Sequence, residues 1–231
     1  MPLARITALT LDLDDTLWPI APVIQRAEST LHAWLSQHAP HTAALHDVAG
    51  LRSLRDQVAA DRPDLAHDLT AVRLEGTRLA LLAAGDDPAL AAPAFEAFIA
   101  ARHDIVFYDD ALPALRRLAA RYPLLAVSNG NADLRRVGLG DYFVGSLSAR
   151  DFGVAKPDPR IFEEACRRLG HPPAQVLHVG DDVRLDVMGA QRAGLPAAWI
   201  QRPDHHAPPV RPEAPVHHYT DLQALADALG C

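Results

Sequence analysis

The sequence predicts an α/β fold: a doubly wound parallel sheet forms the core, and an all-helical domain is inserted into it. Three observations support this class. Short apolar runs end in polar residues, helical patterns lie between these runs, and a long stretch near the N-terminus holds no strand pattern. Alternating strands and helices favour a parallel sheet with helices on both faces. With 49% hydrophobic residues among 231, the chain can bury a sizeable core.

Apolar runs mark the expected strands. A strand buried on both faces is read as a continuous apolar run rather than an alternating one. Each run here stops at acidic or turn-forming residues. The runs are residues 6–13, 124–127, 176–179 and 197–200, and the short segment 217–219 is expected to be an edge strand.

Helical patterns separate these strands. Residues 159–169 are the clearest case, because Asp158 is a plausible N-cap, Pro159 occupies the first helical position and Gly170 follows the last one. Three other helices are expected in the core, over residues 111–121, 183–193 and 221–229. The Pro- and His-rich segment 202–216 between them is expected to be a surface loop.

The stretch between the first and second strands is too long for an ordinary crossover. It holds four helical patterns, interrupted by Pro- and Asp-rich breaks. We therefore expect a helical domain over residues 18–104, and a core built from residues 1–17 and 105–231. The expected helices are residues 22–38, 47–60, 65–84 and 88–102.

Composition narrows the class of partner. The formal net charge of -7 argues against nucleic acid or an anionic membrane. It leaves a small anionic substrate open, because a bound metal can reverse the local field. Cys166 and Cys231 are far apart, which argues against a disulfide framework and favours the reducing cytoplasm. No apolar run has membrane-spanning length, and we expect a cytoplasmic monomer or weak homodimer.

Polar residues follow four candidate strand ends. In open α/β sheets, reactive groups gather beyond the carboxyl ends of the strands, so these residues are expected to meet. Carboxylates, a hydroxyl and an ammonium group together suit a divalent cation with a phosphate. The residues are Asp12, Asp14, Asp15 and Thr16; Ser128 and Asn129; Lys156 and Asp158; and Asp181, Asp182 and Asp186.

The chemistry of these groups suggests roles. Asp12 and Asp181 could hold Mg²⁺, which prefers oxygen ligands, and Asp12 could then attack phosphorus to form an aspartyl-phosphate. Lys156 would neutralise charge on Asp12 and on the phosphate oxygens. Asp14 could protonate the leaving alcohol and later activate water, and its carbonyl could bind the metal.

Other groups are candidate substrate contacts. The Ser128 side chain and the Asn129 backbone N–H could hold phosphate oxygens. Thr16 is a further candidate contact, and Trp18 could stack on a ring of the substrate.

Each residue also has a structural alternative. Asp14, Asp15 and Thr16 could cap a helix, and residues 128–130 could be only a turn. Lys156 could be a solvated loop lysine, and Asp181 and Asp182 could face a helix dipole. Trp18 could pack between the domains. The ordered appearance of all the groups at strand ends favours a shared site over these alternatives.

The ordered set resembles the haloacid dehalogenase superfamily over about residues 6–200. The resemblance implies that Asp12 is the nucleophile and Asp14 the general acid/base, and that Asp12, Asp181 and the Asp14 carbonyl bind Mg²⁺. It also implies that the helical insertion is the family's cap. The four motifs are Leu11-Asp12-Leu13-Asp14-Asp15-Thr16-Leu17, Val127-Ser128-Asn129-Gly130, Lys156-Pro157-Asp158-Pro159, and Val179-Gly180-Asp181-Asp182 extending to Asp186.

Further roles come from the same resemblance. Ser128 and Lys156 match its phosphate-binding positions. Asp186 matches the second acid of the fourth motif, which implies a partner of Lys156 or of a metal-bound water. Asp182 stands where relatives often have Ser. Dehalogenases of this superfamily generally lack an acid at the position of Asp14, so the resemblance implies a phosphatase.

A closer likeness is to the bacterial flavin-pathway phosphatases of this superfamily, which act on FMN and 5-amino-6-(5-phosphoribitylamino)uracil. It extends to residues 67–73 of the helical insertion, where His67, Asp68 and Arg73 are candidates for its inner face, and to residues 138–143 and 177–182. The alternatives are a broad phosphatase for phosphoglycolate, sugar phosphates or nucleotides, a 2-haloacid dehalogenase, and a phosphorylated signalling module. The pairs His205-His206 and His217-His218 lack ligand spacing and are expected to be surface histidines.

Overall fold

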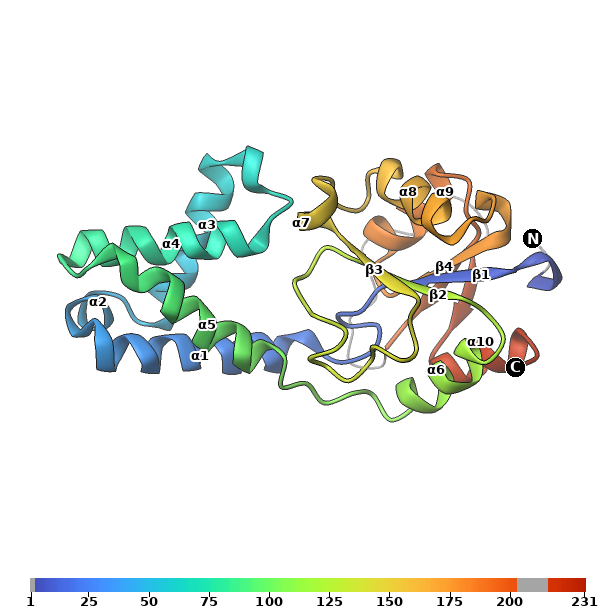
Figure 1. The fold of residues 1–231 in the computed structure, drawn as a ribbon, viewed down its shortest axis with the longest axis horizontal. Helices are drawn as coiled ribbons and strands as arrows, with labels where there is room; N and C mark the ends of the chain where they lie inside the picture. The colour runs from blue at the N-terminus through green and yellow to red at the C-terminus, as the bar shows by residue number, and fades with distance from the viewer. Residues whose placement is uncertain (1–2, 203–215) are drawn as a thin grey trace. The chain divides into compact units, whose positions relative to one another are not determined.

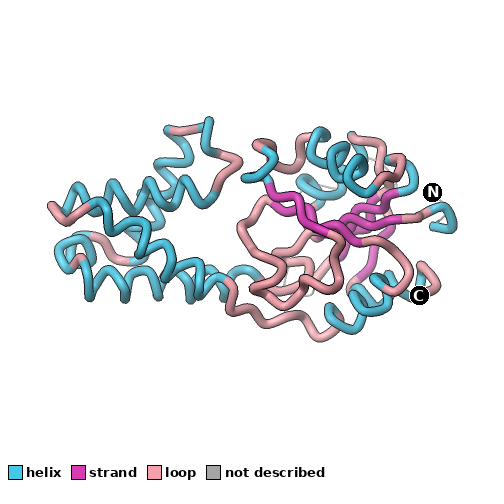
Figure 2. The backbone as a smooth tube through the Cα atoms, viewed as in Figure 1, coloured by secondary structure: helices cyan, strands magenta, loops and turns pink. Residues whose placement is uncertain are grey.

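The computed structural model describes residues 3–202 and 216–231, and the chain divides into two compact units. The first unit comprises Met1–Pro19 and Val106–Cys231, and the second comprises Ile20–Ile105. Trp18, expected in the helical insertion, belongs to the first unit. Among the described residues the strands all lie in the first unit, drawn in magenta in Figure 2. The pair His205-His206 and most of the expected surface loop lie outside the described residues.

The first unit is built on one parallel sheet with β1 near its middle. Leu9 of β1 pairs with Leu124 on one side and with Leu177 on the other. Every residue of β1, β2 and β4 is buried, which explains their continuous apolar sequences. The sheet has the order β3-β2-β1-β4-β5-β6, with strands at Ala8–Leu11 (β1), Leu124–Ser128 (β2), Gly145–Ser148 (β3), Val176–Gly180 (β4), Ala197–Ile200 (β5) and His217–Tyr219 (β6).

This order reverses direction at β1, which places the chain in the doubly wound α/β class. Helices α8 (Pro159–Leu169) and α9 (Gly189–Arg192) cover one face of the sheet, and α6 (Ala111–Ala119) and α10 (Leu222–Ala228) cover the other (Figure 1). On the first face Ile161, Phe162 and the buried Cys166 pack in one core with strand residues. The predicted fold class is confirmed.

Helix α8 begins and ends where its sequence predicts. The Asp158 side chain accepts a hydrogen bond from the Arg160 N–H, and Pro159 opens the helix. Gly170 ends it with a left-handed φ of 73°.

The single helix expected over residues 183–193 is instead a π-helical segment, η5 (Val183–Met188), followed by α9. The π-helical turn contains Asp186, and such turns are frequent at functional sites. Three further short elements in this unit are 3₁₀ turns η1 (Leu3–Arg5) and η4 (Pro173–Gln175) and helix α7 (Ala149–Phe152).

The second unit is all-helical, as expected. Leu31, Leu35, Leu81 and Phe98 are among the side chains of its own hydrophobic core. Its elements are α1 (Ile20–His38), α2 (Pro40–Leu45), α3 (Val48–Asp61), η2 (Pro63–Leu65), α4 (Leu69–Ala84), η3 (Pro88–Leu90) and α5 (Ala91–Arg102). Over the described residues, none of these or the other helices is long and apolar enough to span a membrane.

Two candidate substrate contacts of the helical unit have structural partners within that unit. Asp68 caps α4 by accepting hydrogen bonds from the Thr70 and Ala71 N–H groups. Arg73 lies 3.5 Å from the buried Glu28 carboxylate, and its guanidinium stacks 3.8 Å from the centre of the Phe98 ring. Asp68 thus acts as a helix cap, and Arg73 helps to neutralise a buried carboxylate.

Candidate active site

The loop after β1 fixes Asp12 at the carboxyl end of the sheet. The Asp12 N–H donates to the Val179 carbonyl of β4 at 2.9 Å, which continues the ladder. Asp15 adopts a left-handed φ of 58°, and its N–H donates to the Trp18 carbonyl. Positive φ is uncommon outside glycine, and it turns the chain sharply here. The loop thereby leaves the Asp12 side chain 12% exposed at the strand end.

Lys156 lies between two carboxylates. Its Nζ is 2.6 Å from Asp12 Oδ1 and 2.6 Å from Asp186 Oδ1. Lys156 is 4% exposed, so the solvated-loop alternative does not describe this lysine. Burial disfavours the charged ammonium, but Asp12 and Asp186 outweigh it and raise the pKa of Lys156 above its usual range.

Asn129 positions this lysine through the backbone. Its side-chain Nδ2 donates to the Lys156 carbonyl at 3.0 Å, and its Oδ1 accepts from the Lys156 N–H at 2.8 Å. The two bonds join the end of β2 to the loop before α8. The predicted substrate contact was the Asn129 backbone N–H, and the side chain adds a supporting role that the sequence did not reveal.

Ser128 ends β2 at the same edge of the sheet. Its Oγ accepts from the Gly130 N–H at 2.9 Å, and it is 6% exposed. The turn alternative and the phosphate-binding prediction are thus compatible, because a hydroxyl that accepts one bond can still donate its proton to an anion.

Asp181 follows β4 and is held by two donors. The Thr16 hydroxyl donates to Asp181 Oδ1 at 2.8 Å, so Thr16, predicted as a substrate contact, supports a carboxylate. The Trp199 indole N–H donates to the Asp181 carbonyl at 2.8 Å.

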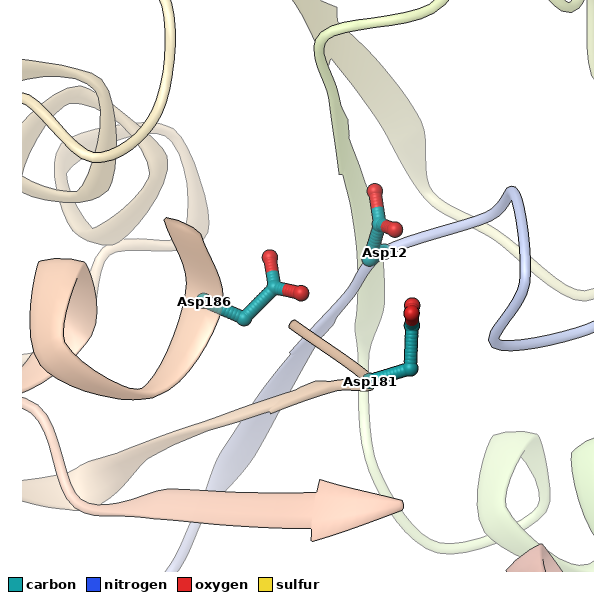
Figure 3. A group of neighbouring side chains, drawn as sticks. All are labelled: Asp12, Asp181 and Asp186. Atoms are coloured by element: carbon teal, nitrogen blue, oxygen red, sulfur yellow. The ribbon is translucent and has the colours of Figure 1, made fainter. Parts of the chain in front are cut away.

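The carboxylates of Asp12, Asp181 and Asp186 converge (Figure 3). They offer oxygen atoms within 4.8 Å of one another. Burial and the neighbouring carboxylates raise the pKa of Asp12 to about 7 and that of Asp181 to about 9, because one lysine does not balance the local negative charge. A cluster of oxygen donors with surplus negative charge fits a hard divalent cation such as Mg²⁺.

Asp186 accepts hydrogen bonds from three donors. Lys156 Nζ and His178 Nε2 approach Oδ1, and the Asp182 N–H donates to Oδ2 at 3.0 Å. Burial opposes ionisation, but Lys156 and His178 overcome it and lower the pKa of Asp186. Because most of its acceptor capacity is used, Asp186 is suited to anchoring Lys156.

Asp182 caps the π-helical segment. Its side chain accepts from the Arg184 and Leu185 N–H groups, each at 2.7 Å, and the side chain is exposed. The structural alternative therefore describes its carboxylate, while its backbone N–H contacts Asp186.

Trp18 requires a correction. It was expected to stack on a substrate ring, but its side chain is fully buried, and the ring meets Phe107 edge-to-face with centroids 5.8 Å apart. Its indole Nε1 donates to Asp14 Oδ1 at 2.9 Å. A tryptophan buried in this way orients Asp14 and leaves no ring face for a ligand.

Arg202 and His178 support the site but did not stand out in the sequence. Arg202 is 2% exposed, donates to the Thr16 carbonyl, and pairs with Asp110 at 2.7 Å. His178 lies in β4, the strand that leads into the fourth motif. Only the apolar residues on either side of it in the sequence indicated that it would be buried. No sequence pattern links Arg202 to Thr16 or Asp110, which lie far from it in the chain.

Among residues 3–202 and 216–231, Asp12, Asp181 and Asp186 form the only group of three or more His, Cys, Asp or Glu side chains that could hold a metal ion. No histidine belongs to this group. His218 instead stacks on Trp199, with ring centroids 4.6 Å apart.

Comparisons with known proteins agree with this geometry. The sequence model of the haloacid dehalogenase-like hydrolase family matches residues 6–194 of this chain. The 5-amino-6-(5-phospho-D-ribitylamino)uracil phosphatase of Escherichia coli K12 is 38% identical, over 88% of this chain and 87% of the relative. A glyceraldehyde 3-phosphate phosphatase of Methanopyrus kandleri is 31% identical, over 85% of this chain and 84% of the relative.

A crystal structure titled 2-haloacid dehalogenase, from Pseudomonas syringae pv. Tomato DC3000, has the same fold. It is 38% identical with a TM-score of 0.89, over 97% of this chain and 98% of that one. The family match covers all four motifs and most of the chain. The resemblance predicted from the motifs is confirmed, and this chain belongs to the haloacid dehalogenase-like hydrolases.

Proposed function

We propose that this protein is a Mg²⁺-dependent phosphatase that hydrolyses a small phosphate monoester through an aspartyl-phosphate on Asp12. The main support is one arrangement at the end of β1. Asp12 contacts the buried ammonium of Lys156, and Asp14, two residues later, is held by the Trp18 indole. A nucleophile beside a cation, followed by a second carboxylate, meets the requirements of phosphoryl transfer to a side chain.

The first chemical step joins Asp12 to phosphorus. A carboxylate oxygen of Asp12 attacks as the bond from phosphorus to the ester oxygen breaks. Lys156 neutralises charge on Asp12 and on the phosphoryl oxygens, and the Ser128 hydroxyl and Asn129 backbone N–H hold two of those oxygens. Asp14 gives its proton to the departing alkoxide.

The second step releases phosphate. Asp14, now ionised, accepts a proton from water as the water oxygen attacks the phosphorus of the aspartyl-phosphate. The bond between phosphorus and the Asp12 oxygen breaks, which restores the Asp12 carboxylate and the protonated Asp14.

Magnesium would be held by the Asp12 and Asp181 carboxylates and the Asp14 carbonyl. When bound, it would offset the repulsion between carboxylates and phosphate and stabilise charge on the phosphoryl oxygens. The convergence of the Asp12, Asp181 and Asp186 carboxylates, with oxygens within 4.8 Å of one another, supports a cation at this position.

The proposed substrate is 5-amino-6-(5-phosphoribitylamino)uracil or FMN. The relative from Escherichia coli supports the first compound by its name, and the similarity to it covers 88% of the chain, including the helical unit. The proposed source of selectivity is this helical unit, residues 20–105, since the groups described in the first unit recognise phosphate and metal.

A 2-haloacid dehalogenase is the competing function, because the Pseudomonas syringae structure has that title. Two features of this chain argue against it. A departing halide needs no proton, so a dehalogenase would not use Asp14 as a general acid. The surplus of carboxylates around Asp12 would also repel the carboxylate of a haloacid.

A substrate panel tests the proposal directly. The purified protein would be assayed with Mg²⁺ against FMN, the ribitylaminouracil phosphate, phosphoglycolate, sugar phosphates, nucleotides and an aryl phosphate, and in parallel for halide release from 2-haloacids. We expect phosphate release from the phosphate esters, with the highest kcat/KM for FMN or the ribitylaminouracil phosphate. A flat profile would indicate a broad phosphatase, and halide release without phosphate release would overturn the phosphatase proposal.

A further inference from the structure

The buried His178 links β1 to Asp186, the carboxylate that holds Lys156. His178, on β4, is fully buried. Its Nδ1 lies 2.9 Å from the Thr10 hydroxyl of β1, and its Nε2 lies 3.2 Å from Asp186 Oδ1. The imidazole is also packed edge-to-face against Phe162 of α8, with ring centroids 4.9 Å apart. Neighbours from β1, η5 and α8 thus restrict its orientation.

The two hydrogen bonds can be assigned a direction. Asp186 is ionised beside Lys156, and an ionised carboxylate only accepts hydrogen bonds. The proton shared with Asp186 must therefore belong to His178 Nε2. Thr10 has a hydroxyl that can donate, so it suits a ring nitrogen that accepts.

The backbone around Asp186 leaves little room for it to move. A Cβ placed on Gly180 would lie 2.3 Å from the Asp186 carboxyl carbon, so glycine is required for this close approach. The Asp182 N–H holds the second carboxylate oxygen. His178 completes the set of donors on the oxygen that also contacts Lys156.

We propose that His178 is a positioning residue that donates its Nε2–H to Asp186 and thereby fixes the ammonium of Lys156 against Asp12. This inference rests on the proposed function where it concerns catalysis. Without the imidazole donor, Asp186 would have one fewer bond to hold its orientation, and Lys156 would lose a fixed anchor opposite Asp12.

Two substitutions separate positioning from packing. His178→Gln keeps an N–H donor of similar reach, whereas His178→Leu removes the donor and fills the space with an apolar group. We expect His178→Leu to lower kcat/KM for the best phosphate ester by about tenfold to a hundredfold, the effect of losing one hydrogen bond to a charged group. His178→Gln should stay within about threefold of the wild type.

His171 provides a matched control. Its Nδ1 lies 2.8 Å from the Thr7 hydroxyl, so it forms the same type of Thr–His pair before β1 begins, without contact to the proposed catalytic groups. His171→Leu should leave kcat/KM unchanged. Equal activity of His178→Leu and the wild type, or equal loss in the Gln and Leu variants, would overturn the positioning role.

Nitrogen-15 NMR of histidine-labelled wild-type protein tests the hydrogen bond without any activity. The resonances that disappear in His178→Gln identify His178, and we expect its Nε2 to bear a proton. An unprotonated Nε2 would contradict the inference. If phosphatase activity is absent, this measurement still decides the hydrogen bond. If activity is present but insensitive to His178→Leu, only the positioning role fails.

Discussion

At the residue scale, the central feature is a set of reactive groups each held by a dedicated partner. Lys156 Nζ bridges Asp12 and Asp186 at 2.6 Å on each side, and it remains charged although it is buried. Removing Lys156 would leave two buried carboxylates without a cation, which costs far more than the loss of a surface ion pair. The position of the proposed nucleophile therefore depends in part on Asp186, which holds Lys156 from the side opposite Asp12.

Asp14→Asn is expected to uncouple the two chemical steps. The amide can neither protonate the leaving group nor accept a proton from water, so kcat should fall by roughly a hundredfold or more. With an aryl phosphate, whose leaving group needs little protonation, phosphorylated Asp12 should accumulate. Rapid-quench kinetics would check this, and a normal rate of phosphate release would argue against Asp14 as the acid/base.

Trp18→Phe is expected to weaken the site by removing the donor that holds Asp14. Phe keeps a ring against Phe107 but lacks the N–H that now holds Asp14 Oδ1 at 2.9 Å. Loss of one such bond to a carboxylate should lower kcat by about tenfold. Trp34→Phe, in a helix of the other unit where Trp34 stacks on His38, is the matched control and should retain full activity. An equal effect of the two substitutions would rule out a specific role for Trp18.

At the element scale, the strand ends bring together residues that are far apart in the chain. The apolar runs predicted β1, β2, β4 and β5, and the parallel order predicted that Asp12 and Asp181 would meet. Lys156, predicted to follow a strand end, instead lies in the loop between α7 and α8. Strand β3 escaped prediction because its sequence, Gly145–Ser148, buries only Leu147. It is a strand because it pairs with β2, and such pairing is not visible in a local pattern.

The supporting contacts could not be predicted for a related reason. Trp199 and His178 each form one hydrogen bond to Asp181 and Asp186, and Arg202 forms two to the Thr16 carbonyl. No periodicity or spacing in the sequence encodes such bonds. For Trp18 the sequence left two roles open, stacking on a substrate ring and packing between the domains. An aromatic residue after a motif suggests stacking, but only the packing against Phe107 shows that both its ring and its N–H are already engaged.

Gly180→Ala tests the close approach of β4 to η5. The added Cβ would lie 2.3 Å from the Asp186 carboxyl carbon, so Asp186 must move. We expect a loss of about 1–3 kcal/mol in the free energy of unfolding, typical of overpacking, and at least a tenfold loss in kcat. Gly145→Ala is the control, because its nearest neighbour would be Leu125 Cδ1 at 3.4 Å. Full activity in Gly180→Ala would show that Asp186 can shift without consequence.

At the scale of the whole molecule, the acidic cluster should make stability depend on pH and metal. Burial, with Asp186 and Asp12, raises the Asp181 pKa from 3.8 to about 9, so the folded protein binds more protons than the unfolded chain between these values. Stability of the metal-free protein should therefore fall as pH rises through this window. Mg²⁺ should restore stability, and more so at high pH, because it competes with the protons.

Thermal unfolding with EDTA or with Mg²⁺ would check this, at pH 6 and pH 8.5. The increase in Tm caused by Mg²⁺ should be larger at the higher pH. Asp181→Asn should reduce both the pH dependence and the effect of the metal. A Mg²⁺ effect that is absent, or the same at both pH values in the wild type and the variant, would count against a metal site at this cluster.

The most direct test of the whole account is detection of the phosphorylated nucleophile. The wild-type protein would be mixed with Mg²⁺ and its best phosphate ester, quenched in acid within a turnover, digested and analysed by mass spectrometry. We expect one phosphoryl group on Asp12, and neither phosphopeptide nor turnover in a folded Asp12→Asn variant. A phosphoryl group on another residue, or phosphate release by Asp12→Asn at the wild-type rate, would contradict the assignment of Asp12 as the nucleophile.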